Sequence, residues 1–430
     1  MQLSELLDEA EVGAFHYKVL LTASLIYCLT AMNVMLIAAL VNPIARDWGL
    51  SVVEIGYLMS SGYLGMFFGA ILFGRLADVI GRRKVLISVI IMESIFTAAC
   101  GLAQDLIALF LLRFLAGMGL GGALPQPGIY VAEYTPKSKR GLFLGLVETS
   151  WVYGVLLSLF IPYLVLPGLG WRSTFSIGLI PLITLPLISS YLPESIRFLA
   201  SKGRVEEIGR LLDALGMKSV ERLEVAPEKK RNIRDLLSGK YFKRTILLFV
   251  LWGGLVYTYH GIFLWLPTIY AKLFGLSDVT SLWWTLLVTL FQIPGYYSAS
   301  FLLDRIGRKK VLATYLIMAG IFSALLSLRV DLTWIFAFSS LISFFNLGAW
   351  SGLYAYTPEL YPTEIRGTGA GVAAAFGRLM GILAPSITGY LFATTGIIGP
   401  FSVFSLVHLI AGFSVAVFGV ETMRRPLEEL

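Results

Sequence analysis

Charged side chains and cysteines are scarce in this chain. Of its 430 residues only 14% are Asp, Glu, Lys or Arg, whereas soluble domains average about 25%. This shortage, together with a hydrophobic fraction of 57%, excludes a water-soluble globular protein. The two cysteines, Cys28 and Cys100, lie within apolar runs and have no Cys or His nearby at a metal-ligand spacing. We therefore expect no disulfide framework, no metal site and no cofactor.

The N-terminal segment lacks the pattern of a secretory signal. Residues 1–17 carry four acidic side chains and no basic stretch ahead of an apolar run, so we expect no cleaved signal peptide. The formal net charge of +7 does not indicate a nucleic-acid surface. Lys and Arg are spread over short loops between apolar runs instead of gathering on one soluble face.

Long apolar runs, in contrast, are abundant and define the fold class. Each is close to the length of about 20 residues at which a helix crosses about 30 Å of hydrocarbon. The sequence thus predicts an all-α membrane protein with twelve transmembrane helices. The predicted spans are residues 19–41, 53–76, 85–103, 106–132, 141–166, 172–192, 245–271, 280–303, 311–328, 332–357, 367–394 and 398–420.

The distribution of basic residues predicts the orientation of these spans. Cytoplasmic loops collect Lys and Arg. Of the 34 basic residues, 28 fall on the side that holds both termini and the one long polar stretch, residues 193–244, in which residues 205–215 favour a helix. The opposite side holds four, namely Arg46, Arg172, Lys272 and Arg329. We expect a multi-pass protein of the cell membrane with both termini in the cytoplasm.

Two loops of the first half recur in the second half at one sequence offset. Residues 78–86 read DVIGRRKVL, and 226 positions later residues 304–312 read DRIGRKKVL. At the same offset, EYTPKSKRG at 133–141 is echoed by ELYPTEIRG at 359–367. A third echo, at an offset of 227, pairs Glu194 and Arg197 with Glu421 and Arg424.

This repeat predicts the domain organisation. Because both copies of each loop lie on the same side, each half contains an even number of spans, which indicates two parallel six-helix bundles. We expect an N-terminal bundle over residues 1–192, a cytoplasmic linker over 193–244, and a C-terminal bundle with a short tail over 245–430.

Through these loops, RFLAGMGLGG at 113–122 and PESIRFL at 193–199, the chain resembles the major facilitator superfamily along its whole length. It looks most like the branch of bacterial aromatic-acid symporters and animal organic-ion transporters, with sugar porters as neighbouring relatives. The resemblance implies that a solute binds between the two bundles and that the bundles rock to alternate access.

The resemblance also implies a gating role for the repeated loops. Gly81 permits a tight turn, and Asp78 is implied to contact the N-terminal end of span eleven, where the helix dipole favours an anion. Glu133 with Arg140 and their repeats are expected in ion-pair networks between spans. The alternative is that these charges only fix the topology. The expected gating residues are Asp78, Gly81, Arg82, Glu133, Arg140, Asp304, Gly307, Arg308, Glu359 and Arg366.

Charged residues inside the spans carry the prediction of the solute, because a charge at the membrane centre costs about 2.5–3.5 kcal/mol. Arg378 lies near mid-depth in span eleven, and a guanidinium binds a carboxylate bidentately. In the branch named above, an Arg at this place recognises an organic anion. The alternative is permanent pairing with another residue of the bundle. Glu93, in span three, is expected to be structural.

Two further charged residues bear on proton coupling. In proton-coupled relatives, the Arg that corresponds to Arg113 pairs with a carboxylate of span one. This sequence has Asn33 there, which cannot titrate. We therefore expect Glu148 in span five to be the proton carrier, with His260 second. If Glu148 is structural, the protein is a uniporter or an exchanger.

Span seven is rich in ring side chains, of which Tyr257 and His260 share a helix face. A ring-lined pocket with few polar anchors suits a planar organic solute. We expect a secondary transporter of a small organic anion, aromatic or another monocarboxylate. The expected solute contacts are Arg378, Tyr257, His260, Phe263, Trp350, Asn33, Gln126 and Trp151.

Other transport functions remain open at this point. The alternatives are transport of a sugar or polyol, uniport, and export of amphipathic drugs. No span carries a hydrolytic triad or a zinc-protease spacing, so we expect no enzyme. The expected partners are a small-molecule solute, a proton and the lipid bilayer, with no nucleic acid, and the protein is expected to be a monomer.

Overall fold

A computed structural model describes residues 11–214, 236, 239, 241–328 and 331–423. Arg329 and Arg424, used above for topology and for the third echo, lie outside the described residues. Every regular element in the described ranges is a helix, mostly α with two 3-10 segments, η1 and η2. The first-half helices are α2 (Ala14–Trp48), α3 (Val52–Ile80), α4 (Arg82–Ala99), η1 (Cys100–Leu102), α5 (Leu106–Ala123), α6 (Gln126–Tyr134), α7 (Lys137–Thr174), η2 (Phe175–Ile183) and α8 (Thr184–Tyr191).

The remaining helices form the linker and the second half. The polar stretch contains two short helices, α9 (Ile196–Ser201) and α10 (Val205–Ala214), of which α10 confirms the helix predicted there. The second-half helices are α11 (Phe242–Phe263), α12 (Leu266–Phe274), α13 (Asp278–Leu290), α14 (Gln292–Ile306), α15 (Arg308–Ser327), α16 (Leu332–Glu359), α17 (Thr363–Thr395) and α18 (Ile398–Phe418).

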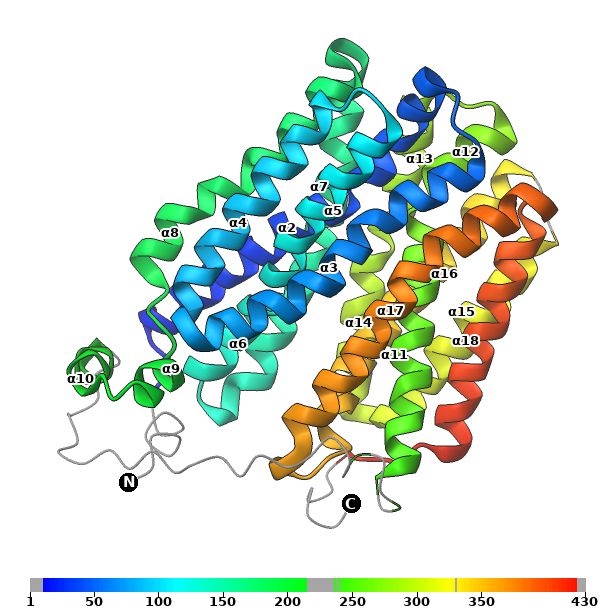
Figure 1. The fold of residues 1–430 in the computed structure, drawn as a ribbon. Coiled ribbons are helices and arrows are strands. Elements are labelled where there is room, and N and C mark those ends of the chain that lie inside the picture. Colours follow the sequence, from blue (N-terminus) through cyan, green and yellow to red (C-terminus); the bar gives the residue numbers. More distant parts are fainter. Residues whose placement is uncertain (1–10, 215–235, 237–238, 240, 329–330, 424–430) are drawn as a thin grey trace. The chain divides into compact units, whose positions relative to one another are not determined.

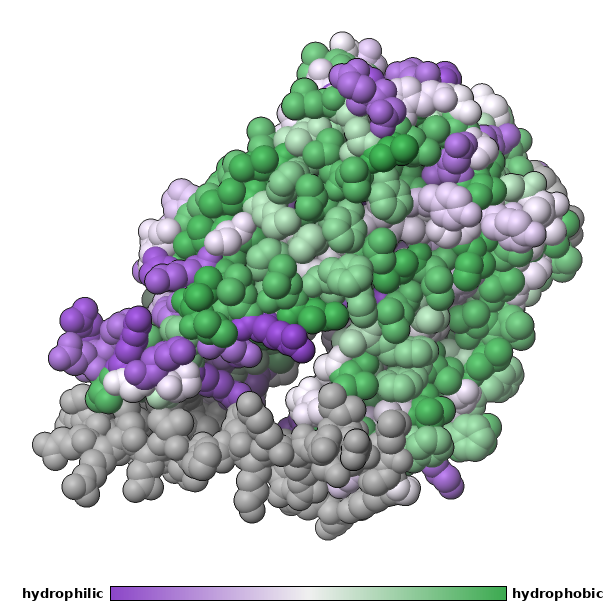
Figure 2. All heavy atoms as spheres, viewed as in Figure 1, coloured by the Kyte–Doolittle hydropathy of each residue, from purple (hydrophilic) through white to green (hydrophobic). Residues whose placement is uncertain are grey.

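The helices account for the predicted membrane spans. In the described part of the chain, 11 helical stretches are long and apolar enough to cross a membrane. One of them, Lys137–Tyr191, is 55 residues long and contains two predicted spans, separated by a break at Gly170 with φ 68°. Several large apolar side chains along these helices are exposed, and Figure 2 shows a largely hydrophobic surface over them, as lipid contact requires.

The chain divides into two compact units. Unit 1 comprises Met1–Val34, Leu64–Leu157 and Arg172–Glu228, and unit 2 comprises Met35–Tyr63, Ser158–Trp171 and Lys229–Leu430. In unit 1, α4 packs along α5; in unit 2, α15 packs along α16 and α18 (Figure 1). The domain boundaries expected at residues 192 and 244 stay a prediction.

Glycines let the helices of unit 1 approach closely. A methyl group added to Gly65 of α3 would overlap the backbone of Phe114 on α5. A methyl group on Gly154 of α7 would likewise overlap the carbonyl oxygen of Cys28 on α2. Small residues at such crossings replace the hydrophobic driving force that is absent between helices in lipid.

The two copies of the repeated loop fold alike. Gly81 and Gly307 have φ values of 108° and 100°, which only glycine adopts without strain. Beside Gly81, a carboxylate oxygen of Glu194 accepts from the backbone N–H groups of Arg82 and Arg83 at 2.7 and 3.1 Å. The third echo therefore has a physical role, because Glu194 supplies the negative charge that a helix N-terminus favours.

The second copy repeats this cap with Glu421, which accepts from the backbone N–H of Arg308 at 2.9 Å. The acids that recur in the second repeated loop, Glu133 and Glu359, pair with the first arginine of α4 and of α15. Glu133 pairs with Arg82, and Glu359 with Arg308 at 3.3 Å.

The other predicted gating residues have different surroundings. Arg140 and Arg366 each donate to a backbone carbonyl oxygen five residues earlier, at 3.2 and 3.3 Å. Asp304 pairs with Arg308 at 3.0 Å. Contact of Asp78 with span eleven, and gating itself, stay predictions.

Candidate functional site

A cluster of aromatic side chains from α11 and α16 forms the centre of unit 2. The ring of Trp252 lies 5.6 Å from Trp350 and 5.5 Å from Tyr354, measured between ring centroids. Tyr259 joins it through Trp350 at 6.4 Å and Phe263 at 4.8 Å. We call these five residues the ring cluster. The indole N–H of Trp252 donates to Thr357 Oγ1 at 3.0 Å, and the hydroxyl of Tyr259 donates to Gln292 Oε1 at 3.3 Å.

His260 extends the ring cluster towards α3. Its ring lies 5.3 Å from Tyr259 and 4.7 Å from Tyr63, which is the last residue of the α3 segment in unit 2. The Nδ1 atom of His260 is 2.9 Å from the carbonyl oxygen of Val256, which can only accept, so Nδ1 carries a proton. The other ring nitrogen, Nε2, is therefore the atom at which this imidazole can gain or lose a proton.

Arg378 lies at the middle of α17, on the helix that packs against α11. The glycines beside it make the contact. A methyl group on Gly377 would lie 3.0 Å from Val256, and one on Gly381 would lie 3.2 Å from Val256 and 3.4 Å from Tyr63. Arg378 is half-buried, so its guanidinium is neither sealed in the core nor on an open surface. The α17 glycines thus bring Arg378 next to the α11 segment that carries His260.

Tyr257 has a different neighbour from His260, although the two are three residues apart. Its ring packs 5.8 Å from Phe404 of α18. Of the predicted solute residues, His260, Phe263 and Trp350 are joined through the ring of Tyr259, whereas Tyr257 contacts α18. Arg378 lies on the neighbouring helix α17.

The remaining predicted solute and coupling residues lie in unit 1. Asn33 on α2 is fully buried and donates to the carbonyl oxygen of Gly178 at 3.2 Å. The backbone carbonyl oxygen of Asn33 accepts a hydrogen bond from the guanidinium of Arg113 at 3.4 Å. This hydrogen bond joins α2 to α5. Gln126, at the start of α6, is buried, and its Oε1 has no hydrogen-bond partner among the described residues.

Glu148, the expected proton carrier, is half-buried on α7. Its Oε2 accepts from the hydroxyl of Tyr27 on α2 at 2.8 Å. The same tyrosine ring packs 5.9 Å from Trp151, one turn further along α7. The proximity of Glu148 and Trp151 expected from their spacing therefore includes a residue of α2.

Sequence reasoning missed Tyr63 and did not place Trp252, Tyr259 and Tyr354 at the site. Trp252 and Tyr259 lie in the ring-rich part of span seven, a signal that could have included them. Tyr63 lies on α3, far from span seven in the sequence, and Tyr354 lies one turn after Trp350. Nothing in their spacing reveals that the tertiary fold brings them together.

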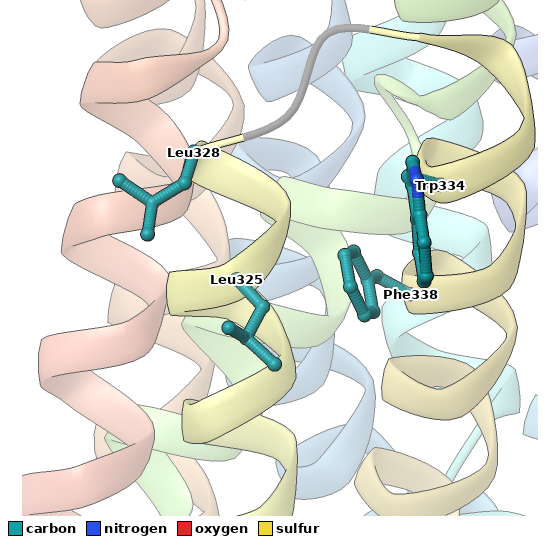
Figure 3. A pocket seen from close by; sticks show the side chains of 4 residues that line it. All are labelled: Leu325, Leu328, Trp334 and Phe338. Carbon is teal, nitrogen blue, oxygen red and sulfur yellow. The ribbon is translucent and has the colours of Figure 1, made fainter.

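A separate cavity in unit 2 has a different character. It has a volume of about 340 Å³ and lies where α15 ends and α16 begins, lined by Leu325, Leu328, Trp334 and Phe338 (Figure 3). These four side chains are apolar apart from the indole N–H of Trp334, so the part of the lining that the structure describes carries no charge. Among the described residues, no group of three His, Cys, Asp or Glu side chains is arranged to hold a metal ion.

Comparison with known proteins decides the family. The family described as sugar (and other) transporter matches residues 14–430. The chain belongs to this family. It is thus a multi-pass membrane transporter, which confirms the resemblance to the major facilitator superfamily.

Two bacterial relatives match this transporter over nearly its whole length. The niacin transporter of Acinetobacter baylyi is 38% identical, with 100% of each chain covered. The putative niacin/nicotinamide transporter of Bacillus subtilis is 36% identical, with 96% of this chain and 98% of the relative covered. A 4-hydroxybenzoate transporter of Acinetobacter baylyi is 30% identical and covers 87% of this chain and 84% of its own length.

Solved structures confirm the fold of the transporter. A D-xylose–proton symporter superimposes with a TM-score of 0.75 over 95% of this chain and 99% of the other, at 20% sequence identity. At this identity the match concerns the fold alone. Together with the helices described above, it confirms twelve transmembrane helices in two bundles.

Proposed function

We propose that this transporter moves a small aromatic monocarboxylate of the nicotinate and benzoate type across the cell membrane by alternating access. The observation that carries the proposal is Arg378 at the middle of α17, beside an α11 segment whose rings pack with α16. Relatives named for niacin and 4-hydroxybenzoate support the same class of solute.

The two parts of such a solute need two kinds of contact. Its carboxylate needs a cation, and the planar guanidinium of Arg378 can donate two parallel hydrogen bonds to it. Its ring needs apolar or aromatic surfaces, because aromatic pairs contribute about 0.5–1.5 kcal/mol beyond the area that they bury. His260, Phe263 and Trp350 provide such surfaces in unit 2.

The other solute contacts expected from the sequence are part of the proposal as well. Asn33, Gln126 and Trp151 of unit 1, and Tyr257 of unit 2, are proposed to contact the solute at some stage of the cycle. Glu148 and Arg113 are proposed to bear on coupling to protons. We further propose that the protein acts as a monomer, with both termini in the cytoplasm.

Uptake by the full chain in liposomes tests the solute class. Labelled nicotinate and benzoate are offered beside D-xylose and a cationic dye. The proposal expects uptake of the two acids, each inhibited by the other, and neither D-xylose nor the dye should compete. Uptake of D-xylose with no uptake of either acid would replace the proposed solute with a sugar.

Substitution of Arg378 tests the anion contact. Arg378→Gln removes the charge and should reduce carboxylate uptake at least about tenfold, because a charge-assisted bidentate pair is lost. Arg378→Lys keeps the charge without the planar fork and should retain part of the activity. The matched control is Lys243→Gln, at an exposed position near the start of α11. Full uptake by Arg378→Gln would remove Arg378 from the site.

A further inference from the structure

Glu93 on α4 is a carboxyl that unit 1 encloses completely. None of its surface is exposed. Its Oε1 accepts from Thr30 Oγ1 of α2 at 3.2 Å, and its Oε2 has no hydrogen-bond partner among the described residues. Neither the ring cluster nor the contact of Glu148 with Tyr27 involves this acid. It is an ionisable group in the membrane interior without an assigned role.

The helices around Glu93 pack closely against α4 through glycines. On α5, a methyl group at Gly119 would overlap the backbone of Glu93. On η2, a methyl group at Gly178 would overlap the side chain of Thr97, one turn along α4 from Glu93. The hydroxyls of Ser94 and Thr97 have no hydrogen-bond partner in the described ranges. The cluster therefore contains more polar atoms than it satisfies.

The groups that face Glu93 from these helices are nearly all neutral. From α2 they are Thr30 and, one turn on, Asn33, whose Oδ1 also lacks a partner among the described residues. The segment η2 (Phe175–Ile183) has no ionisable side chain. On the elements that pack against α4, the ionisable side chains are Arg113 of α5, Cys100 of η1 and Tyr191 of α8, and on α2 Tyr27 and Cys28 precede Thr30.

Arg113 is the cation of this set, and α2 connects it with Glu93. Thr30 donates to Glu93, and the carbonyl oxygen of Asn33 accepts from Arg113. The two α2 residues are three positions apart, about 4.5 Å along the helix axis. Glu93 and Arg113 therefore contact α2 at two points about one turn apart.

This environment suits a protonated carboxyl. An ionised carboxylate with one neutral donor and an orphan oxygen is strongly disfavoured in the interior, and the group takes up a proton instead. A side chain needed only for shape and a hydrogen bond would be served by glutamine. A carboxyl has one property that glutamine lacks, which is reversible binding of a proton.

We propose that Glu93 is the binding site of a proton whose movement is coupled to transport. The inference rests on the proposed function and adds the coupled ion and its site. In the state described here, Glu93 is protonated and neutral. When the cluster opens to water, the proton leaves as hydronium, and water hydrates the carboxylate that remains. One proton binds and one is released in each cycle, and no other bond changes.

The test compares exchange with coupled uptake in liposomes that contain the full chain. Exchange of labelled nicotinate against unlabelled nicotinate needs no net proton movement. Uptake driven by an acidic exterior does need it, and a pH-sensitive dye trapped inside reports the proton that enters. We expect Glu93→Gln to retain exchange while losing all stimulation by the pH gradient and the solute-dependent proton entry. The matched control, Glu54→Gln, changes a half-buried acid in the first turn of α3 and should retain both.

The outcomes separate this inference from the proposed function. If the wild-type protein exchanges no aromatic acid, the proposed function fails. If it exchanges the acid without any proton entry, only the role of Glu93 fails. Undiminished coupling in Glu93→Gln overturns the inference, and so does normal coupling in Glu93→Gln beside lost coupling in Glu148→Gln, which assigns the proton to Glu148.

A second variant covers the case in which Glu93→Gln does not fold. Thr30→Val keeps the carboxyl and removes its hydrogen-bond donor. Because a carboxylate that loses a donor holds its proton more tightly, the pH midpoint of gradient-driven uptake should move to a higher value. An unchanged midpoint in a folded Thr30→Val protein also overturns the inference.

Discussion

The pair formed by Arg46 and Asp278 gives a prediction about how the helices of unit 2 separate. Arg46 lies in the last turn of α2 in the first half of the chain, and Asp278 begins α13 in the second half. One nitrogen of Arg46 donates to both carboxylate oxygens of Asp278, at 2.9 and 2.8 Å. We expect that this contact must break whenever these two helix ends move apart during transport.

The magnitude follows from exposure and geometry. The side chain of Arg46 is 69% exposed and that of Asp278 is 12% exposed. Exposed ion pairs contribute about 0.2–1 kcal/mol, which is about 1.4- to 5-fold in an equilibrium constant. A single nitrogen makes both hydrogen bonds, so the pair lacks the parallel fork of the strongest arginine contacts. The expected coupling energy is therefore within that range and not above it.

A double-mutant cycle measures this coupling. Spin labels at Leu50 and Lys272, in a background without the native cysteines, report the fraction of molecules in which the two helix ends are together. Arg46→Ala and Asp278→Asn should each lower this fraction. The double variant should fall less than the sum of the two changes, by the coupling energy.

Salt provides the internal control for the cycle. Raising the salt concentration from about 0.01 M to about 1 M shortens the Debye length from about 30 Å to about 3 Å and should remove most of the coupling. A coupling energy of zero at low salt refutes the reasoning. A coupling that salt does not change would mean that the contact is not electrostatic, and this too refutes it.

The other predictions concern the caps and the glycine contacts. Glu194→Ala removes a helix cap and should cost about 0.5–2 kcal/mol of stability, which lowers the thermal midpoint and speeds hydrogen exchange at the first turn of α4. Glu421→Ala should have the same effect at the first turn of α15. Unchanged hydrogen exchange at both helix starts would contradict the caps. Gly154→Ala should destabilise the protein by about 1–3 kcal/mol because its methyl group meets the backbone of Cys28. Gly145→Ala, on the same helix with open space around it, is the control, and equal thermal midpoints for the two alanine variants would refute the close contact.

The repeated loops illustrate how far sequence patterns reach. Equal spacing identified Glu194 and Glu421 as partners in a repeat, and the positive φ values of Gly81 and Gly307 fit the turn that these glycines permit. The pattern could not predict which arginine pairs with Glu133 or with Glu359. Glu133 pairs with Arg82, 51 residues away, although Arg140 is nearer in the sequence. Sequence distance does not measure spatial distance once two helices have packed side by side.

The two acids Glu93 and Glu148 show the same limit of sequence patterns at the candidate sites. The sequence placed both Glu93 and Glu148 inside spans and favoured Glu148 as the proton carrier. Only the packed unit reveals that Glu148 accepts a hydrogen bond from the hydroxyl of Tyr27, whereas one oxygen of Glu93 has no hydrogen-bond partner among the described residues. That difference depends on contacts of α7 and α4 with α2, which no local pattern encodes.

The sequence by itself determined the membrane class, the twelve spans, the repeat and the family, because each depends on the length of an apolar run or on a motif within one loop. The tertiary structure alone decided which rings surround His260, which helix packs against the glycines beside Arg378, and which acid is left with an orphan oxygen. The physical reason is that helix formation in lipid is local, since each backbone hydrogen bond closes within four residues. The polar environment of a side chain is set by helices that are distant in the chain and pack through glycines.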